Sequence, residues 1–338
     1  MRKDFQQIDV IKGFAIISVI ILHSIDEKEL LNTYSVLHIW QAVPLFMVLM
    51  GLNAGMSVFN KKPQFSELYT KTYFKKKFER IIIPFLIIFG LSIVLGFIWY
   101  WITGQYKIEF RKSNLMGVLP VAGPGNYFIT LTFQSILLLP VIKYVFKWRP
   151  FVALISLVVL EVAFLLISDD LQLFTRNKYL YSAAFPRYFS AIAFGLVLSK
   201  LVFRQARATK ITLITSAALI SGIYLLEMMY GDLDLPQIKE EWKTQNVLTF
   251  SYAACIILLL FKALPDYSNN WFLRFLAIMG KSSYHIFLLQ IVYFGLISDR
   301  FNLVQNLIIC LVLGYLFCRY EKRIKAFFLP KKVAKPVY

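Results

Sequence analysis

The stretch IDVIKGFAIISVIILHSI, residues 8–25, decides the class of fold, because it is long and apolar enough to cross a membrane yet carries a lysine and a histidine. Lys12 and His23 are 11 residues apart. At about 100° per residue, this spacing is close to three helical turns, so both side chains lie near one face, separated by roughly 16 Å along the helix. Ionisable side chains inside a membrane helix are costly, and this pair therefore marks a candidate functional site.

The composition of the chain is that of a membrane protein. Of its 338 residues, 58% are hydrophobic, which is more than a soluble globular domain needs. The net charge of +18 does not indicate nucleic-acid binding, because Lys and Arg gather in alternate loops, as on the cytoplasmic side of a membrane protein. Cys255, Cys310 and Cys318 lie in or beside apolar segments, at spacings that fit neither a disulfide framework nor a zinc site. We expect packing roles for them and no metal.

Ten apolar segments of near-spanning length follow one another along the chain. They cover about 8–25, 36–59, 81–102, 126–146, 150–168, 185–203, 210–230, 247–264, 272–297 and 301–318. We predict an all-α fold, a polytopic membrane helix bundle with about ten transmembrane helices. It forms a single domain over residues 1–330, followed by a short basic cytoplasmic tail at 331–338.

The loops predict the orientation of this bundle. An even number of helices puts both termini on one side of the membrane. Residues 60–80 and the tail from Arg319 onward are rich in Lys and Arg, whereas the loop after the first segment begins with acids at Asp26. Because cytoplasmic loops carry the excess of Lys and Arg, both termini are predicted to be cytoplasmic. Lys12 then lies toward the cytoplasm and His23 toward the outside.

Both residues of this pair have a functional and a structural interpretation. His23 can take a proton from an acceptor hydroxyl near neutral pH, or it can cap the external end of its helix. Lys12 can pair with Asp9, one turn earlier, and face a polar chamber, or it can extend back to the cytoplasmic surface. The depth of Lys12 and the shared helix face favour function.

Other ionisable residues within the predicted helices indicate a polar chamber in the bundle. They are Glu161, Arg187, Glu227, Lys281 and His285. Arg187 follows Pro186 at the predicted external mouth of its segment, as a site residue or as an interfacial anchor. Ser283 and Tyr284 follow Lys281, and they either bind a hydroxylated substrate or hydrogen-bond to neighbouring helices. Which acid pairs with which cation is left open.

A basic run, KKKFERIIIP at residues 75–84, leads directly into the third apolar segment. Lys76, Lys77 and Arg80 suit two roles. One is attraction to anionic lipid headgroups, which charge alone favours. The other is binding of the phosphates of a soluble cytoplasmic donor.

Five motifs together resemble the acyltransferase-3 family of bacterial membrane proteins. In the family's order they are Asp9-x-x-Lys12-Gly13-x-Ala15 with His23, residues 75–84, Asn126-Tyr127-Phe128, Arg187 with Phe194-Gly195, and residues 280–290. Lys12 stands in place of the family's usual arginine, which keeps the charge but loses the planar fork. Met50-Gly51-Leu52 replaces a common S-G-F. Phe287 and Gln290 replace a tyrosine and a histidine, so no proton role is expected at Gln290.

The resemblance implies a membrane O-acyltransferase. Such an enzyme moves an acetyl group, or another acyl group such as succinyl, from acyl-coenzyme A to a hydroxyl of an envelope glycan or its lipid-linked precursor. Carried over by position, His23 is the catalytic base or a proton relay, and Lys12 and Arg187 are further catalytic residues. Lys76, Lys77 and Arg80 face the coenzyme A phosphates. Asp9, Ser283 and Tyr284 are candidates for substrate binding.

The resemblance also implies a multi-pass protein of the bacterial cytoplasmic membrane, surrounded by lipids and without a nucleic-acid partner. A transporter of a glycan or small molecule is the alternative, because many helices with buried charges suit it equally well. Saturable binding of acyl-coenzyme A favours the enzyme, and substrate movement without a donor favours the transporter. A sensor or scaffold leaves Lys12 and His23 without a role. The acceptor and the oligomeric state are not decided by the sequence.

Overall fold

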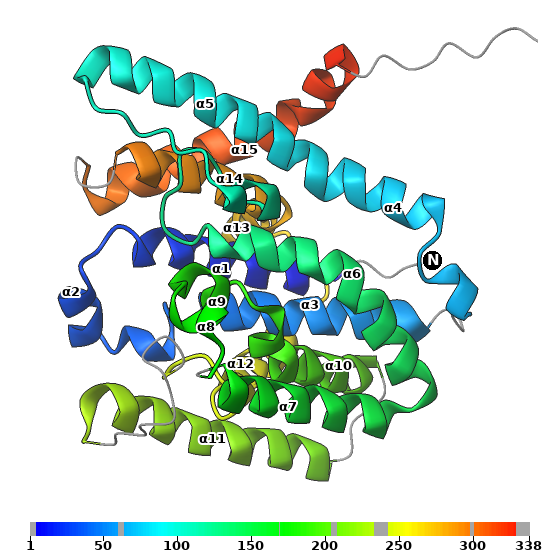
Figure 1. The fold of residues 1–338 in the computed structure, drawn as a ribbon. Coiled ribbons are helices and arrows are strands. Elements are labelled where there is room, and N and C mark those ends of the chain that lie inside the picture. The colour runs from blue at the N-terminus through cyan, green and yellow to red at the C-terminus, as the bar shows by residue number, and fades with distance from the viewer. Residues whose placement is uncertain are drawn as a thin grey trace, which may run out of the picture.

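In a computed structural model, the chain folds as a bundle of α-helices (Figure 1). The structure describes residues 5–59, 64–168, 170–203, 208–232, 243–297 and 301–328. Within these ranges all regular elements are helical, which confirms the all-α prediction. The predicted basic tail at 331–338 and the first part of the basic loop, 60–63, lie outside the described residues.

The longer helices form the body of the bundle. They are α1 (Gln6–Leu22), α3 (Ala42–Phe59), α5 (Ile83–Thr103), α6 (Tyr127–Trp148), α7 (Pro150–Ile167), α10 (Phe189–Phe203), α11 (Ala208–Tyr230), α12 (Phe250–Ala263), α13 (Trp271–Lys281), α14 (Ser283–Leu296) and α15 (Leu303–Phe328). The shorter helices are α2 (Glu27–Asn32), α4 (Lys71–Lys77), α8 (Gln172–Thr175) and α9 (Lys178–Ser182). Figure 1 shows α1 and α3 near the middle of the bundle, with α5 along one margin and α11 along the opposite one.

Seven described helical segments are long and apolar enough to cross a membrane, or eight if the bent pair α13–α14 is one span. The protein is therefore a multi-pass membrane protein. Two predicted segments correspond to shorter helices, α1 with 17 residues and α12 with 14 residues. The figure of about ten spans and the cytoplasmic location of the termini stay predictions.

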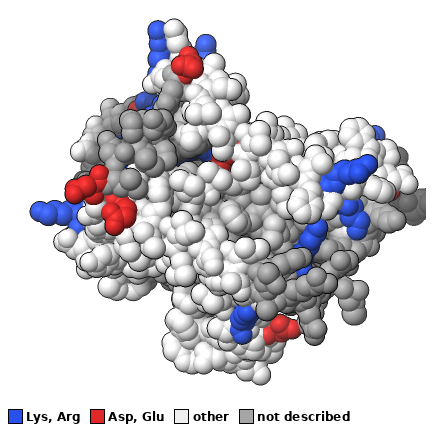
Figure 2. Space-filling view, turned by 90° about the horizontal axis from the view of Figure 1, so that it is seen from below, with Lys and Arg blue, Asp and Glu red and all other residues white. Residues whose placement is uncertain are grey.

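The surface also fits a lipid environment. Large apolar side chains are exposed on α5, α7 and α11, where Trp101, Phe151 and Leu219 are 86%, 78% and 70% exposed. In water, apolar patches of this extent are rare on a monomer. Figure 2 shows a face with a broad expanse of uncharged residues and with its charged side chains mostly toward the margins.

Two central helix pairs pack backbone against backbone at glycines. In the α1–α13 pair, a Cβ on Gly13 would overlap the backbone of α13, and a Cβ on Gly280 would overlap the carbonyl oxygen of Asp9. In the α3–α10 pair, Gly51 and Gly195 each lie against the backbone of the other helix in the same way. Small residues allow such close approach in membranes, where packing rather than the hydrophobic effect joins helices. These contacts hold α1 and α3, which both carry residues of the candidate site.

The last predicted helix before α15 is broken in two. Residues 272–297 were expected to form one apolar segment, but the chain bends by 69° between α13 and α14. The break falls at Ser282, within the polar run that begins at Lys281. At membrane depth, an interrupted helix is tolerated where its freed backbone groups are buried in protein or line a polar cavity. The break therefore points to the candidate site.

Candidate active site

A cavity of about 1190 Å³ lies between α1, α3, α6, α13, α14 and the junction of α4 with α5. It exceeds the roughly 300–1,000 Å³ that is typical of pockets for drug-sized ligands. Both Lys12 and His23 line it, as do the site candidates Asp9, Ser283 and Tyr284. The pair first noted in residues 8–25 therefore faces one internal space, and neither residue points to lipid.

The cavity is strongly cationic. The charged side chains in its described lining are Lys12, Lys77, Arg80, Lys143, Arg274, Lys281 and Asp9, which are six cations and one carboxylate. Like charges gathered in a cleft with low-dielectric walls concentrate the field and attract ions of opposite sign. The cavity is thus suited to a ligand that carries several negative charges.

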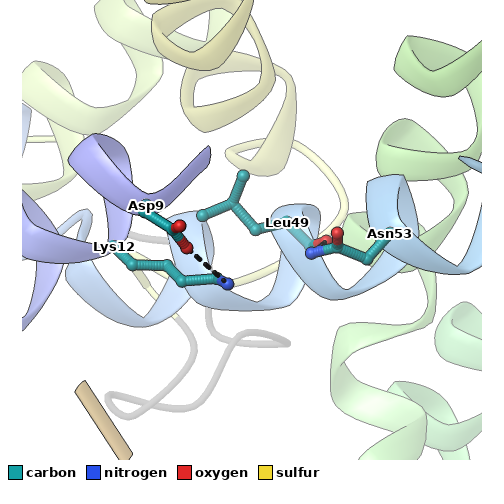
Figure 3. Close-up of polar contacts among 4 residues, drawn as sticks. All are labelled: Asp9, Lys12, Leu49 and Asn53. Atoms are coloured by element: carbon teal, nitrogen blue, oxygen red, sulfur yellow. Dashed lines mark hydrogen bonds and ion pairs between the residues drawn. The ribbon is translucent and has the colours of Figure 1, made fainter. Parts of the chain in front are cut away.

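Lys12 makes the ion pair that its spacing from Asp9 predicted. Its Nζ lies 3.5 Å from Asp9 Oδ1, and the two side chains are 23% and 22% exposed. Figure 3 shows the lysine extending away from α1 toward α3, near Leu49 and Asn53. The Asn53 side-chain amide donates a 2.9 Å hydrogen bond to the Leu49 carbonyl oxygen. The Lys12 ammonium therefore lies in the cavity beside Asp9, and the functional and structural interpretations of this residue both stay predictions.

His23 ends α1 and lies against the loop that precedes α6. Its backbone N–H donates to the carbonyl oxygens of Val19 and Ile20. Its ring meets Phe294 edge to face, with centroids 6.0 Å apart. A Cβ on Gly125 would lie only 3.3 Å from His23 Nε2, and Gly125 has a φ of +82°. The Nε2 edge of the imidazole thus lies at a turn that both the backbone conformation and the available space restrict to glycine.

Three aromatic side chains from three helices line the cavity beside His23. They are Phe46 on α3, Phe128 on α6 and Phe287 on α14, which we call the aromatic collar. Ring centroids are 5.9 Å apart for Phe46 and Phe128, and 5.3 Å apart for Phe128 and Phe287. Phe287 also lies 3.6 Å from the place where a Cβ on Gly125 would be. The collar makes the cavity apolar next to the histidine.

At the cationic end, the junction of α4 and α5 is a π-helical turn over Phe78–Ile82. Pro84 lacks an N–H, so it cannot donate to the carbonyl oxygen of Arg80 four residues earlier, and a wider turn results. The Tyr284 hydroxyl donates a 3.0 Å hydrogen bond to the Ile81 carbonyl oxygen in this turn. Of the two interpretations of Tyr284, the structure supports a bond to a neighbouring helix.

Only two of the three cations predicted to bind the donor line the cavity. Lys77 and Arg80 line the cavity, whereas Lys76 is exposed and is not among the lining residues. The α4 segment is bound to α6 by the Tyr73 hydroxyl, which donates a 2.7 Å hydrogen bond to the Ile136 carbonyl oxygen. That carbonyl has no helical donor, because the residue four positions later is Pro140.

Arg187 lies outside the cavity lining, in a buried cluster behind it. It is 2% exposed, and its guanidinium carbon lies 4.9 Å from the centre of the Tyr181 ring. Glu161 lies nearby and accepts hydrogen bonds from the backbone N–H and the hydroxyl of Ser190, at 2.7 Å and 2.6 Å. The two interpretations of Arg187, as a site residue and as an interfacial anchor, both stay predictions. Its burial assigns it to the wall of the bundle.

A second histidine also reaches the cavity. His285, at the start of α14, lines the space, and its Nε2 lies 3.2 Å from Glu321 Oε2 on α15. Gln290, five residues further along α14, is fully buried and is not among the lining residues. No group of three or more His, Cys, Asp and Glu side chains in the described ranges is arranged to hold a metal ion.

Some lining residues were missed in the sequence. Lys143 and Arg274 lie within predicted spanning segments, so the rule that singled out Lys12 also applies to them. Gly125 belongs to a turn that the Gly and Pro residues of 120–128 indicate, but nothing in the sequence shows that it faces His23. Phe46 is indistinguishable in sequence from the other phenylalanines of the bundle.

The fold and cavity define a class: a multi-pass membrane protein with an internal anion-attracting cavity that ends at a histidine. A comparison with family models assigns the chain further, because the model described as "Acyltransferase domain" matches residues 5–320. The chain therefore belongs to the acyltransferase-3 family and is a membrane acyltransferase. No curated protein and no solved structure matches it.

Proposed function

We propose that the protein transfers an acetyl group, or another short acyl group, from cytoplasmic acyl-coenzyme A to a hydroxyl of an envelope glycan or its lipid-linked precursor. The observation that carries this proposal is that one cavity is lined by both the cluster of cations and His23. A donor with several phosphates needs the first feature, and a hydroxyl acceptor needs the second.

The donor is proposed to bind with its phosphates at the cationic end. Arg80 at the π-helical turn, Lys143 on α6 and Arg274 on α13 approach this space from three different elements, together with Lys77 and Lys281. Charge-assisted hydrogen bonds from Lys and Arg to phosphate oxygens are among the strongest that side chains make. Lys12 lies on α1, the helix that carries His23. It would therefore neutralise negative charge nearer the thioester than the other cations do.

The acyl transfer step is proposed to occur at His23. As the acceptor oxygen attacks the thioester carbonyl carbon, Nε2 takes the hydroxyl proton. The tetrahedral intermediate then collapses, the carbon–sulfur bond breaks, and the proton returns from the imidazolium to the leaving thiolate, which yields free coenzyme A. General base catalysis of this kind contributes about 10²–10⁴-fold to the rate. An acyl-enzyme intermediate is the other route to the same products.

The collar supports a short acyl group. Phe46, Phe128 and Phe287 occupy the space beside His23 where the acyl chain of a bound donor would lie. The predicted orientation puts the cationic end toward the cytoplasm and His23 toward the outside. The acyl group would therefore move from a cytoplasmic donor toward the outside. A location in the bacterial cytoplasmic membrane suits this path from donor to acceptor.

The test is His23→Ala in membrane vesicles supplied with labelled acetyl-coenzyme A. Incorporation of label into envelope glycans should fall by at least about 100-fold, because the base is lost. Binding of coenzyme A to the purified variant should stay within about two-fold of wild type, since the cations are untouched. Acylation at the wild-type level would contradict the role of His23. Glycan movement across vesicles without any acyl donor would instead favour a transporter.

A further inference from the structure

The basic segment 71–80 presents two different faces. Lys77 and Arg80 line the cavity. Lys71, Lys75 and Lys76 are exposed, and none of them is among the cavity-lining residues. The side chain of Lys75 is 77% exposed. Two cations of this short segment therefore face the cavity, and three lie on the surface away from it.

Exposed aromatic rings accompany the outer lysines. Phe74 and Phe78 are 42% and 48% exposed, and Phe65, shortly before α4, is 69% exposed. Lys71 and Lys75 are four residues apart, as are Phe74 and Phe78, so the lysines and the rings form two neighbouring stripes on the helical segment. We call Lys71, Phe74, Lys75 and Phe78 the outer face; Lys76 is also exposed, but it lies about 100° further around the helix than Lys75.

The chemistry of the outer face matches the headgroup region of an anionic membrane. Within residues 71–80 there are five cations and one acid, Glu79, whose carboxylate lies 4.0 Å from Lys75 Nζ, so this segment keeps an excess of positive charge. Aromatic rings favour the membrane–water interface, and lysines there are attracted to anionic headgroups. The segment continues without a gap into α5, whose exposed Leu86 and Val94 face the surrounding lipid.

We propose that the outer face binds the headgroups of anionic phospholipids in the surrounding membrane. The Tyr73 hydroxyl holds the segment on α6 and Tyr284 holds the following turn on α14, so the lipid-binding and cavity faces are fixed relative to one another. This part rests on the proposed function: a lipid bound to the outer face keeps Lys77 and Arg80 in place at the donor end of the cavity.

The experiment compares matched variants of one segment. Wild type, Lys71→Gln/Lys75→Gln and Lys77→Gln/Arg80→Gln are purified in detergent with added phosphatidylglycerol. Retained lipid is counted by native mass spectrometry, and coenzyme A binding is measured by calorimetry. Each lysine near an anionic surface contributes roughly a five-fold factor in affinity. The outer double variant should lose phosphatidylglycerol by more than about ten-fold and keep coenzyme A binding, and the cavity double variant should behave in the opposite way.

Lys76→Gln is the deciding single variant. The family resemblance implies a contact of Lys76 with coenzyme A, whereas in this structure Lys76 is exposed and is not among the cavity-lining residues, so the proposal extends the lipid contact to it. A drop of about five-fold in bound phosphatidylglycerol with unchanged coenzyme A binding supports the proposal. A drop in coenzyme A binding alone contradicts it.

Further controls distinguish binding of an anionic phospholipid from binding of a free phosphate compound. Inorganic phosphate and glycerol 3-phosphate should not displace the lipid from wild type, and phosphatidylcholine should not replace it. Unchanged lipid retention in the outer double variant, or equal loss in the cavity double variant, would overturn the proposal. If wild type bound phosphatidylglycerol but no coenzyme A, the proposed function would fail and the lipid site would stand. Thermal melting curves of each variant show that it is folded.

Discussion

At the scale of single residues, the Nε2 edge of His23 lies against a glycine, Gly125. Gly125 has a φ of +82°, and a Cβ placed on it would lie 3.3 Å from His23 Nε2. A side chain would have to adopt a left-handed backbone conformation and also displace the imidazole. Gly125 is therefore a positioning residue for the proposed base.

Gly125→Ala should reduce acyl transfer while donor binding persists. The added methyl meets the Nε2 edge of His23, and the left-handed conformation costs about 1–2 kcal/mol for a residue with a Cβ. We expect kcat to fall at least about ten-fold with KM for acyl-coenzyme A nearly unchanged. The rates are measured in vesicles with labelled donor.

The matched control is Gly104→Ala. Gly104 has a φ of +70° but open space around the position of a Cβ. Gly104→Ala therefore has a similar cost in backbone strain but places no methyl group against His23. This variant should keep wild-type kcat. Equal losses in both variants would mean that folding, and not the position of His23, explains the effect.

Single residues also show what the sequence could reveal about the site. Lys12 and His23 could be selected because charge in a membrane helix is costly wherever it occurs. Arg187 was selected by the same rule, yet it lies in a buried cluster beside Glu161, because burial and pairing depend on how distant helices pack. Gly125 could not be selected, since its role depends on a contact across more than 100 positions of sequence.

At the scale of elements, a proline releases a backbone carbonyl that a tyrosine from another helix then binds. Pro140 leaves the Ile136 carbonyl oxygen without a helical donor, and the Tyr73 hydroxyl supplies one. The bond joins α4 to α6 and so determines where Lys77 and Arg80 stand.

Tyr73→Phe should weaken donor binding more than catalysis. Removing the hydroxyl leaves a half-buried carbonyl without its partner, at a cost of about 1–3 kcal/mol, and loosens α4 on α6. We expect KM for acyl-coenzyme A to rise about three- to ten-fold, with kcat within about two-fold. Tyr106→Phe, at a residue that is 60% exposed, is the control. A kcat defect with normal KM would contradict the positioning role.

The elements were predictable from hydropathy, but their interruptions were not. The polar run from Lys281 was visible in the sequence as a polar middle of one helix. Its 69° bend falls at Ser282, two residues after Gly280, which meets the Asp9 backbone in the packing of α13 on α1. Periodicity describes one helix at a time, and so it cannot show where a neighbouring helix forces a break.

At the scale of the whole molecule, the cavity changes character along its length. Cations from α1, α6, α13 and the π-helical turn give way to the aromatic collar beside His23. Phosphates and an acyl chain need these two environments in this order. The sequence indicated a polar chamber, but the gradient within it needs the three-dimensional arrangement of five helices.

Phe287→Ala should broaden the range of acyl groups. Removing the ring opens space between Phe128 and His23, where the acyl chain of the donor is proposed to lie. We expect the ratio of kcat/KM for hexanoyl- over acetyl-coenzyme A to rise at least about ten-fold, because each buried CH₂ gains about 0.8 kcal/mol. The measurement uses a series of acyl-coenzyme A donors of increasing chain length.

Phe294→Ala provides the comparison for the collar. Phe294 contacts the ring of His23 but does not line the cavity. This variant should lower the rate with every donor and leave the order of preference unchanged. A wild-type preference in Phe287→Ala would contradict the role of the collar.

The glycine contacts between α1 and α13 have a consequence for the donor. Lys12 and His23 on α1, and Arg274 and Lys281 on α13, belong to one closely packed pair of helices, since the two backbones meet at Gly13 and Gly280. The separation between the charge cluster and the imidazole is then set by this packing. A small acyl phosphate can reach one end of this pair or the other, but only a donor with a long arm between its phosphates and its carbonyl reaches both at once. Under the proposed function, the backbone contact would thereby select donors by their length.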